Sequence, residues 1–563
     1  MLAPRALAPD GSAVSGFRFD GPTVTYEGAE PVDAGVRFER ELPSTDDPRW
    51  LVPGVFYGEN RLEGCTRIYP RFTRGQVDVA RMESDAWSFR ADRCATPAAL
   101  VNGRGLITSE KSPLGQAGVG FAWRDGRPTV WLDFPYREEP LRYDGSETPA
   151  SPDAQTYRWR PGETVALDVR EADATPLRPG EAFVDASWVS VEEAAELAAW
   201  GLHRWHYRAD PPRLLETVSF DREHPDDRDH MHVSWVSGAP YGYALLRHGL
   251  RVRNDDYVAA ATAVLNHIAA NLAPGGTFWS QWTAERGWTW GWHPDRSRLH
   301  ARTLADATLF LQRATALRPT PLWERAVRSN LDVVDRTQRE DGALPAAHHV
   351  VTGEAVSWKG TAGMAWIPAL VEAGRLEEAR RAGAYYAQFD AWYGAPEDVD
   401  LAPTSEDGYA AVMAFVALED WETAKRAADW TLTFRYTYDV EFAPDTMLGR
   451  YGFRTRGGDQ ASPANQHLHA FGLVCLPEMV RLAQATSDDY YLETTRENLA
   501  CFRQFVARHD GDFGAQRGMT SERYYQTDVF APKGGLLPLS HAWTGGLLLY
   551  ACEAVLADHA ELR

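Results

Sequence analysis

The chain has 563 residues, and 58 lysines and arginines stand against 79 aspartates and glutamates, which gives a formal net charge of −21. A chain of this length can bury large cores, and two domains are the natural expectation. The acidic balance argues against a general nucleic-acid binder and against attachment to an anionic membrane surface. No long uncharged run could span a bilayer, and residues 1–12 hold no apolar signal core. We therefore expect a cytoplasmic protein, or a secreted one if this sequence is a mature form.

The cysteines and glycines give no sign of a bound cofactor or metal. Five cysteines are odd in number and widely spaced: Cys65, Cys94, Cys475, Cys501 and Cys552. No pair has the spacing of a zinc or redox site, which favours a reduced compartment. Walker loops and dinucleotide fingerprints are missing from the sequence. We expect no cofactor and no metal.

Short stretches of alternating apolar and polar residues fill the first part of the chain. They are Thr23–Tyr26, Val36–Glu41, Arg67–Phe72, Val77–Met82 and Thr164–Val169. Phe121–Arg124 and Thr129–Leu132 flank Asp125-Gly126, a strong signal for a β-hairpin. We predict an antiparallel β-sandwich with its linker over residues 1–185, and Ala174–Ser190 as the connection to the rest.

The remaining residues, 186–563, read as twelve helices in six consecutive pairs. The odd-numbered helices are charged on one side, as outer helices are: Val191–Tyr207, Asp255–Asn271, Leu322–Gln338, Arg375–Phe389, Trp421–Tyr436 and Asp488–His509. The even-numbered helices are richer in Ala, Gly and Leu, which suits inner helices: Val236–Gly249, Leu299–Leu317, Gly360–Gly374, Ser405–Asp420, Asn465–Thr486 and Leu539–Asp558. The pattern predicts an (α/α)6 barrel after the sandwich.

Local signals mark where these helices begin and end. Ser190 with Glu193 makes a capping box, and Thr320-Pro321 supplies a cap and a first-turn proline. Glycines follow three of the outer helices, as helix ends require. Paired helices around a ring place their six connecting loops on one face, so we expect a substrate cleft there.

A tryptophan-rich segment, Phe278–His293, precedes the second inner helix. It contains Trp279, Trp282, Trp288, Trp290 and Trp292. Indole faces pack against the C–H side of a sugar ring while polar groups take its hydroxyls. We therefore predict that these five residues bind a saccharide; the alternative is that they only plug the mouth of the barrel.

With these helix pairs and aromatic loops the chain resembles the six-hairpin glycosidases. The resemblance covers both halves in outline and identifies no individual family. It implies an (α/α)6 barrel, often with an N-terminal β-sandwich, and a glycoside-cleaving enzyme. It also implies acidic catalysts on the loops that lead into inner helices.

Cleavage of a glycosidic bond needs a protonated carboxyl and a second carboxylate. Glu285 lies in the tryptophan-rich segment, where apolar walls would raise its pKa, although a solvent-facing pair with Arg286 is the alternative. Glu406 and Asp407 open an inner helix, where they could be catalysts or simply first-turn acids. Glu522 precedes the last inner helix, and we predict that it is the base or nucleophile.

Other polar residues on the same loops are candidates for binding sugar hydroxyls. They are Asp229, His232, His349, Asp459, His469, Tyr524 and Tyr525. A metal held by His230 and His232 is a weaker interpretation, because alternate residues of a loop fix no ligand geometry. We expect a glycoside hydrolase whose partner is an oligo- or polysaccharide. A polysaccharide lyase or sugar epimerase that uses Tyr and His, and a non-catalytic glycan-binding protein, are the alternatives.

Overall fold

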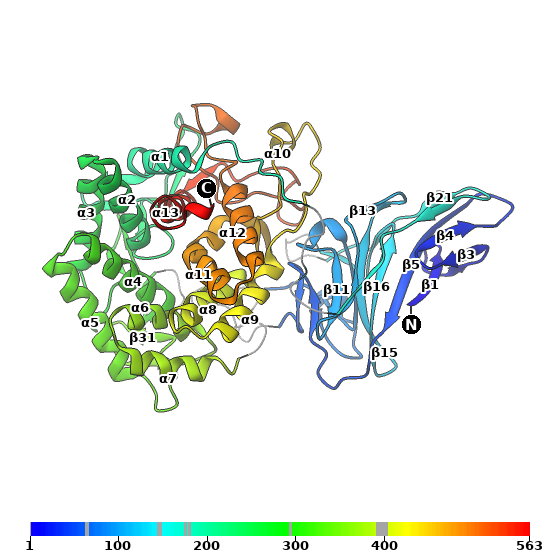
Figure 1. Cartoon of the computed structure of the whole chain (residues 1–563), viewed down its shortest axis with the longest axis horizontal. Coiled ribbons are helices and arrows are strands. Elements are labelled where there is room, and N and C mark those ends of the chain that lie inside the picture. Colours follow the sequence, from blue (N-terminus) through cyan, green and yellow to red (C-terminus); the bar gives the residue numbers. More distant parts are fainter. Residues whose placement is uncertain are drawn as a thin grey trace.

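The structure is a computed structural model, and it describes residues 2–61, 67–143, 149–173, 177, 182–291, 295–389 and 403–562. Strands gather in one half of the molecule and helices in the other (Figure 1). Among these residues no helix has the length and apolar character to cross a membrane.

The six predicted helix pairs are present within the described residues. Their members in chain order are α1 (Val191–Gly201), α2 (Ala239–Val252), α3 (Asp255–Ala269), α4 (Ala301–Leu317), α5 (Pro321–Thr337), α6 (Trp366–Glu372), α7 (Leu376–Tyr386), α8 (Ser405–Ala417), α9 (Trp421–Thr431), α11 (Leu476–Thr486), α12 (Asp489–Phe502) and α13 (Ala542–Asp558). A short helix, α10 (Met447–Arg450), lies between α9 and α11.

The helices that were predicted as inner helices form a closed ring. Helix α2 contacts α4, and the contacts continue from α4 to α6, α8, α11 and α13, which returns to α2. The outer helices α3, α5, α7, α9 and α12 pack against the inner helices that they adjoin in sequence, and α1 packs against α13 (Figure 1). Inner helices are therefore buried on most sides, as their apolar composition predicts.

The predicted cap at Ser190 is confirmed, whereas the Thr320 side chain makes no cap hydrogen bond at the start of α5. The Ser190 hydroxyl accepts a hydrogen bond from the Glu193 backbone N–H at 3.1 Å, which begins α1. After α5, Gly342 has φ of 98°, and a β-carbon there would approach the Arg381 carbonyl oxygen to 2.3 Å. Only glycine fits this position without strain, and the close approach sets α5 against α7.

The strands before α1 form two large antiparallel sheets and a smaller one. The first contains β10 (Ala86–Arg90), β15 (Gly118–Arg124), β16 (Arg127–Phe134), β5 (Val32–Glu41), β1 (Leu2–Leu7) and β2 (Ala13–Val14), with β21 (Tyr157–Trp159) paired to β5. The second contains β23 (Arg170–Ala172), β12 (Arg104–Ile107), β11 (Ala98–Val101), β6 (Trp50–Val52) and β7 (Phe56–Tyr57). The smaller sheet contains β22 (Thr164–Ala166), β4 (Thr23–Tyr26) and β3 (Phe17–Asp20).

The predicted hairpin is confirmed, and one predicted strand is wrong. Asp125 and Gly126 join β15 to β16 with φ of 49° and 77°, the left-handed pair that a two-residue turn needs. Val77–Met82 contains instead a short 3-10 helix, Val79–Arg81. The Asp78 carboxylate accepts hydrogen bonds from the backbone N–H groups of Ala80 and Arg81. This local cap outweighs the alternating pattern.

One buried apolar cluster fills the helical region, and another lies between the sheets. The second cluster also takes in Ala464 and Val529, which belong to loops of the helical region. The two regions therefore share part of one core, and the loops that contribute these residues are fixed by the sheets.

Short strands stand before the inner helices. They pair as β27 (His230–His232), β28 (Gln281–Thr283) and β29 (Gly287–Thr289); β30 (Arg298–His300), β31 (Ala347–His349) and β32 (Ala355–Ser357); β33 (Asp459–Ser462) and β34 (Asn465–His469); and β26 (Thr217–Ser219) and β35 (Leu539–His541). The pairs β27–β28, β30–β31 and β26–β35 join loops from different hairpins, so these strands tie one end of the ring together.

Two buried histidines predict how the stability of this fold depends on pH. Burial lowers the pKa of His206 and of His348 to about 4. In the unfolded chain the pKa of histidine is about 6.5, so the unfolded state binds more protons below that pH. The free energy of unfolding should therefore fall as the pH drops from about 6.5 to about 4, by up to ~3 kcal/mol for each residue.

The variant His348→Leu tests this dependence. The hydroxyl of Thr337, which meets the imidazole at 3.1 Å, keeps its bond of 2.7 Å to the Val333 carbonyl. Urea unfolding at several pH values should show a shallower decline in the variant than in the wild-type chain. An identical slope would contradict the assignment.

Candidate functional site

Histidines end four of the strands that lead into inner helices. His232 ends β27 before α2, His300 ends β30 before α4, His469 ends β34 before α11, and His541 ends β35 before α13. All four side chains are buried. The hairpin repeat thus places imidazoles around the same end of the ring.

Local hydrogen bonds fix the protons of three of these imidazoles. The backbone N–H two residues further on donates to Nδ1: Ser234 to His232 at 3.3 Å, Phe471 to His469 at 3.3 Å and Trp543 to His541 at 3.4 Å. An acceptor at Nδ1 places the proton of a neutral imidazole on Nε2. Burial lowers the pKa of His469 and, to about 3, that of His541, which favours the neutral form of these two rings.

The Nε2 atoms of two of these rings meet hydroxyl groups. Nε2 of His469 lies 3.2 Å from the Ser405 hydroxyl, and Nε2 of His232 lies 3.2 Å from the Thr303 hydroxyl. Ser405 in turn donates to the Ala461 carbonyl at 3.3 Å, which leaves its oxygen to accept from the imidazole. Both rings are therefore hydrogen-bond donors with occupied lone pairs.

Three aromatic rings from different hairpins form a triangle between these histidines. Their centroids are 5.8 Å apart for Trp235 and Trp543, 6.0 Å for Trp235 and Phe471, and 5.6 Å for Phe471 and Trp543. The Arg302 guanidinium lies 3.9 Å from the Trp235 ring and 4.4 Å from the Phe471 ring. Stacking on two aromatic faces holds this cation in the interior.

The first turn of α8 adds two carboxyl groups. Glu406 forms an ion pair with Arg302, and both side chains are buried. Asp407 is buried as well, and burial, followed by the charge of Glu406, raises the pKa of Asp407 well above its usual value. The pair of adjacent carboxyl groups therefore has unequal surroundings, since Glu406 has a cationic partner and burial raises the pKa of Asp407.

A cavity inside the ring lies beside this turn. Helices α4, α6, α8 and the segment before α11 contribute its walls: Arg302, Asp306, Leu309, Ala365, Pro368, Glu406, Tyr409, Ala410, Met413, Phe471 and Val474. The arginine and the glutamate thus face a small space of about 20 Å³ that is walled mainly by apolar and aromatic groups.

Several buried polar atoms near the triangle have no hydrogen-bond partner among the described residues. They include Oδ2 of Asp407, Nε1 of Trp543 and the Thr544 hydroxyl. Buried polar groups are nearly always paired, and orphaned ones mark strain or a place for a ligand. A hydroxyl-rich ligand would satisfy one donor and one acceptor of this set.

Glu522 lies at the edge of the same cluster. Its carboxylate is 3.2 Å from the Arg523 guanidinium, and its side chain is 15% exposed. Its charge is one of several that oppose the effect of burial on the pKa of His469. The structure therefore brings together four of the predicted residues: Glu406, Asp407, His469 and Glu522.

The tryptophan-rich segment lies differently from the prediction. Trp282 stacks with Arg213 at 4.7 Å, and Trp288 lies 4.9 Å from His267 of the outer helix α3. In the sheet of β27, β28 and β29, Trp282 pairs with Met231 on one side and with Trp288 on the other. His232 pairs with Gln281. Alternation along the strands puts Trp282 and Trp288 on the face opposite His232.

Trp282 and Trp288 therefore lie away from the histidine cluster, and their predicted saccharide role stays a prediction. Trp279 is part-buried against the core of the helical region. Trp290 lies 5.7 Å from the Arg296 guanidinium. Trp292 lies outside the described residues.

Two predicted carboxylates are already occupied, and a third is not enclosed. The Glu285 side chain is 82% exposed beside Arg286, so the apolar walls that we expected around it are missing there. Asp229 binds Arg213 through both oxygens, at 2.6 and 2.9 Å. Asp459 is buried and accepts two hydrogen bonds from one arginine, which makes it a structural residue rather than a ligand contact.

The predicted tyrosines and the remaining histidine have local roles. Tyr524 is buried and stacks on Phe453 at 5.2 Å, with its hydroxyl on the Phe505 carbonyl at 3.3 Å. Tyr525 is buried near Glu522 and Arg523, and burial raises its pKa. His349 accepts two backbone hydrogen bonds through Nδ1 at 3.2 Å in the turn after β31.

Sequence reasoning missed the aromatic triangle, Arg302, His300 and His541. The signal was present as a histidine followed two or three positions later by a large aromatic residue, at the entrance of inner helices. It occurs as His232 with Trp235, His469 with Phe471 and His541 with Trp543. Within the described residues no three His, Cys, Asp or Glu side chains are arranged to hold a metal ion.

No family model and no curated protein matches the chain. Among solved structures, it is similar to a D-mannose isomerase over 65% of this chain and 97% of the other, with 14% identity and a TM-score of 0.46. A polysaccharide lyase matches over 98% and 89%, with 9% identity and a TM-score of 0.48. A family 76 glycoside hydrolase from a bovine Bacteroides thetaiotaomicron strain matches over 95% and 98%, with 8% identity and a TM-score of 0.43.

With TM-scores below 0.5, these structures carry no argument about what this chain binds or which reaction it performs. Enzymes with six-hairpin barrels are among the structures that the chain is similar to, and no individual family is identified.

Proposed function

We propose that this chain is a carbohydrate-acting enzyme that cleaves a glycosidic bond, with Asp407 as the acid and Glu522 as the base or nucleophile. The observation that carries the proposal is the buried carboxyl of Asp407 beside the Glu406–Arg302 pair, where burial raises its pKa well above the usual value. An acid that assists a leaving oxygen must hold its proton near neutral pH. Burial of Asp407 supplies this condition.

A second carboxylate of different environment supports the same chemistry. Glu522 is less buried than Asp407 and forms an ion pair with Arg523. Hydrolysis needs such a pair, one carboxyl protonated and the other ionised. Glu406 has the separate task of neutralising Arg302.

The aromatic triangle supports a sugar as the substrate. Its rings offer apolar faces, while the indole N–H of Trp543 offers a donor. Sugars present apolar C–H faces and hydroxyls together, so they match such a surface.

The histidines favour hydrolysis over proton abstraction from carbon. A base must have a free lone pair, but Nδ1 of His232, His469 and His541 accepts a backbone hydrogen bond. Tyr524, the other candidate of a lyase or epimerase, lies in an aromatic core. The imidazoles are therefore better placed to donate to hydroxyls than to remove a proton.

The architecture is part of the same proposal. The two large sheets contact each other through β11, β12, β15 and β16, and we take them as a β-sandwich over residues 1–185. The (α/α)6 barrel then covers residues 186–563 and carries the cleft. A saccharide is the partner that we propose for this cleft.

The activity is tested by incubating the full chain with aryl glycosides and with a panel of polysaccharides, and by following new reducing ends. Release of reducing sugar supports the proposal. Formation of an ultraviolet-absorbing, unsaturated sugar would instead identify a lyase, and exchange of a carbon-bound proton in heavy water would identify an epimerase. Binding without turnover would identify a glycan-binding protein.

A variant of Trp543 tests the binding surface. Trp543→Phe removes the unpaired indole N–H and leaves the aromatic face. We expect saccharide affinity to fall about 5- to 10-fold, the loss of one hydrogen bond of about 1 kcal/mol. Calorimetric titration of the same saccharide provides the measurement.

Trp288→Phe is the matched control. Trp288 lies against α3 and away from His232. The affinity of the Trp288→Phe variant for the saccharide should therefore equal that of the wild-type chain. A loss in Trp288→Phe with none in Trp543→Phe would return the binding site to the tryptophan-rich segment.

A further inference from the structure

The loop before α13, residues 521–541, is held as a rigid double strand. We call it the site loop, because it begins next to Glu522 and ends at His541. Its two halves pair through backbone hydrogen bonds: Leu537 N–H to the Arg523 carbonyl at 3.0 Å, Tyr525 N–H to the Gly535 carbonyl at 3.0 Å and Gly534 N–H to the Tyr525 carbonyl at 2.8 Å. A displacement at the tip of the site loop is therefore transmitted to the two ends of the loop, at Glu522 and His541.

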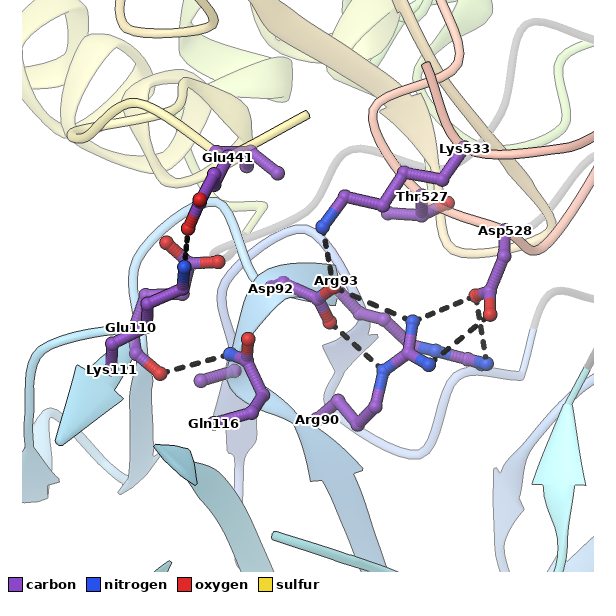
Figure 2. A network of polar contacts seen from close by, with 12 residues as sticks. Arg90, Asp92, Arg93, Glu110, Lys111, Gln116, Glu441, Thr527, Asp528 and Lys533 are labelled. Atoms are coloured by element: carbon purple, nitrogen blue, oxygen red, sulfur yellow. Dashed lines mark hydrogen bonds and ion pairs between the residues drawn. The ribbon is translucent and has the colours of Figure 1, made fainter. Parts of the chain in front are cut away.

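The tip of the site loop is bound by the sheet region. Asp528 accepts hydrogen bonds from Arg90 at 2.9 and 3.1 Å and from Arg93 at 3.2 Å. Lys533, on the returning half, donates to Asp92 at 2.8 Å. Figure 2 shows these side chains converging from the two regions. Between them, Val529 is buried in the apolar cluster of the sheets.

The two arginines at this contact are shielded from water, whereas Asp528 is partly exposed. The side chain of Arg93 is 2% exposed, that of Arg90 14%, and that of Asp528 38%. Burial raises the pKa of Asp528, but Arg93 and Arg90 together hold it below its usual value. Shielded, charge-assisted hydrogen bonds of this kind fix geometry far better than surface ion pairs do.

The other loop of the cleft is tied to the same place. In β33, the Gln460 side chain bonds the Gly54 carbonyl of the sheet region and accepts from Gln526 of the site loop at 2.8 Å. Strand β33 pairs with β34, which ends at His469. The sheets thus support both sides of the candidate cleft.

We propose that Asp528, bound by Arg90 and Arg93, is a positioning residue that sets the place of Glu522 and His541 in the cleft. The N-terminal sheets then contribute to the site, although none of the described residues that line its cavity belongs to them. The role in turnover rests on the proposed function, whereas the role in holding the loop does not.

Asp528→Asn tests the proposal. It removes the charge and keeps the shape, and both arginines keep other partners: Arg90 bonds Asp92 at 3.0 Å, and Arg93 bonds Glu138 at 3.1 Å. Folding should therefore survive. We expect hydrogen exchange of the backbone amides in residues 521–537 to accelerate about tenfold, because local opening becomes easier.

Glu441→Gln is the matched control. It breaks the Lys111–Glu441 ion pair, which also joins the two regions but does not involve the site loop (Figure 2). Exchange in residues 521–537 should be unchanged in this variant. Unchanged exchange in Asp528→Asn, or equal acceleration in both variants, would overturn the proposal whether or not the chain cleaves a glycoside.

Turnover gives the second readout. In Asp528→Asn we expect kcat to fall about 10- to 100-fold with little change in KM, since a displaced Glu522 affects the reaction more than binding. Wild-type kcat in this variant would also overturn the proposal. A wild-type chain that cleaves no glycoside would instead refute the proposed function, and the exchange experiment would still decide the positioning role.

Discussion

Replacing Asp407 by asparagine is expected to lower glycoside turnover about 10²- to 10⁴-fold, the usual contribution of a positioned acid. Asparagine keeps the shape of the protonated carboxyl and cannot transfer its proton. Asp407 is already neutral in the folded protein, so the substitution places no new charge in the interior. Steady-state rates on a natural glycan and on an activated aryl glycoside measure the effect.

The two substrates distinguish an acid from a residue that only shapes the site. An aryl leaving group needs little protonation, so Asp407→Asn should retain more activity on the aryl glycoside than on the natural glycan. Wild-type turnover of both substrates would exclude Asp407 as the acid. Equal losses on both would assign it a structural role.

The same variant has a signature in stability. The folded protein keeps a proton on Asp407 that the unfolded chain releases above about pH 4. The free energy of unfolding of the wild-type chain should therefore decline as the pH rises above that value. Asp407→Asn lacks this term, so its stability should change less with pH in denaturant titrations at pH 5 and pH 8.

The second large effect concerns Asp459. Its carboxylate accepts hydrogen bonds from Arg435 at 2.8 and 3.2 Å and from Asn498 at 2.8 Å, and all three side chains are buried. Asp459→Asn leaves the arginine as an uncompensated cation in the interior. The expected cost is about 3–5 kcal/mol of unfolding free energy, measured by denaturant unfolding.

Asp332→Asn provides the comparison on the outer surface. Asp332 is more than half exposed and pairs with Arg375 at 2.8 Å, and that arginine has a second partner in Asp335. Its loss should cost less than about 1 kcal/mol. Equal costs at the two sites would contradict the structural role assigned to Asp459.

The helical architecture could be predicted from the sequence because its signals are local. Apolar periodicity and caps such as Ser190 lie within one or two turns of the helices that they define. The closed ring then follows from pairing. The strand predicted over Val77–Met82 failed because a single aspartate, Asp78, caps a tight turn that the alternating pattern does not reveal.

The site was only partly predictable because it depends on contacts between distant hairpins. Glu406 and Asp407 could be named from their place at a helix start, but only the partner Arg302 and the burial of the turn separate their roles. For the tryptophans, composition does not say which face of a strand points inward. Strand register decides that, and it places Gln281 rather than Trp282 beside His232.

The contact between α1 and α13 has a consequence for how the protein is made. These helices are the first and the last of the ring, yet they pack together. Non-local contacts of this kind form late, because a long intervening chain must first be ordered. During synthesis the barrel therefore stays open until its last helix emerges, with the apolar flanks of α1 and α2 uncovered. His541 and Trp543 reach the cleft at the same moment, so a chain arrested before α13 should be both aggregation-prone and inactive.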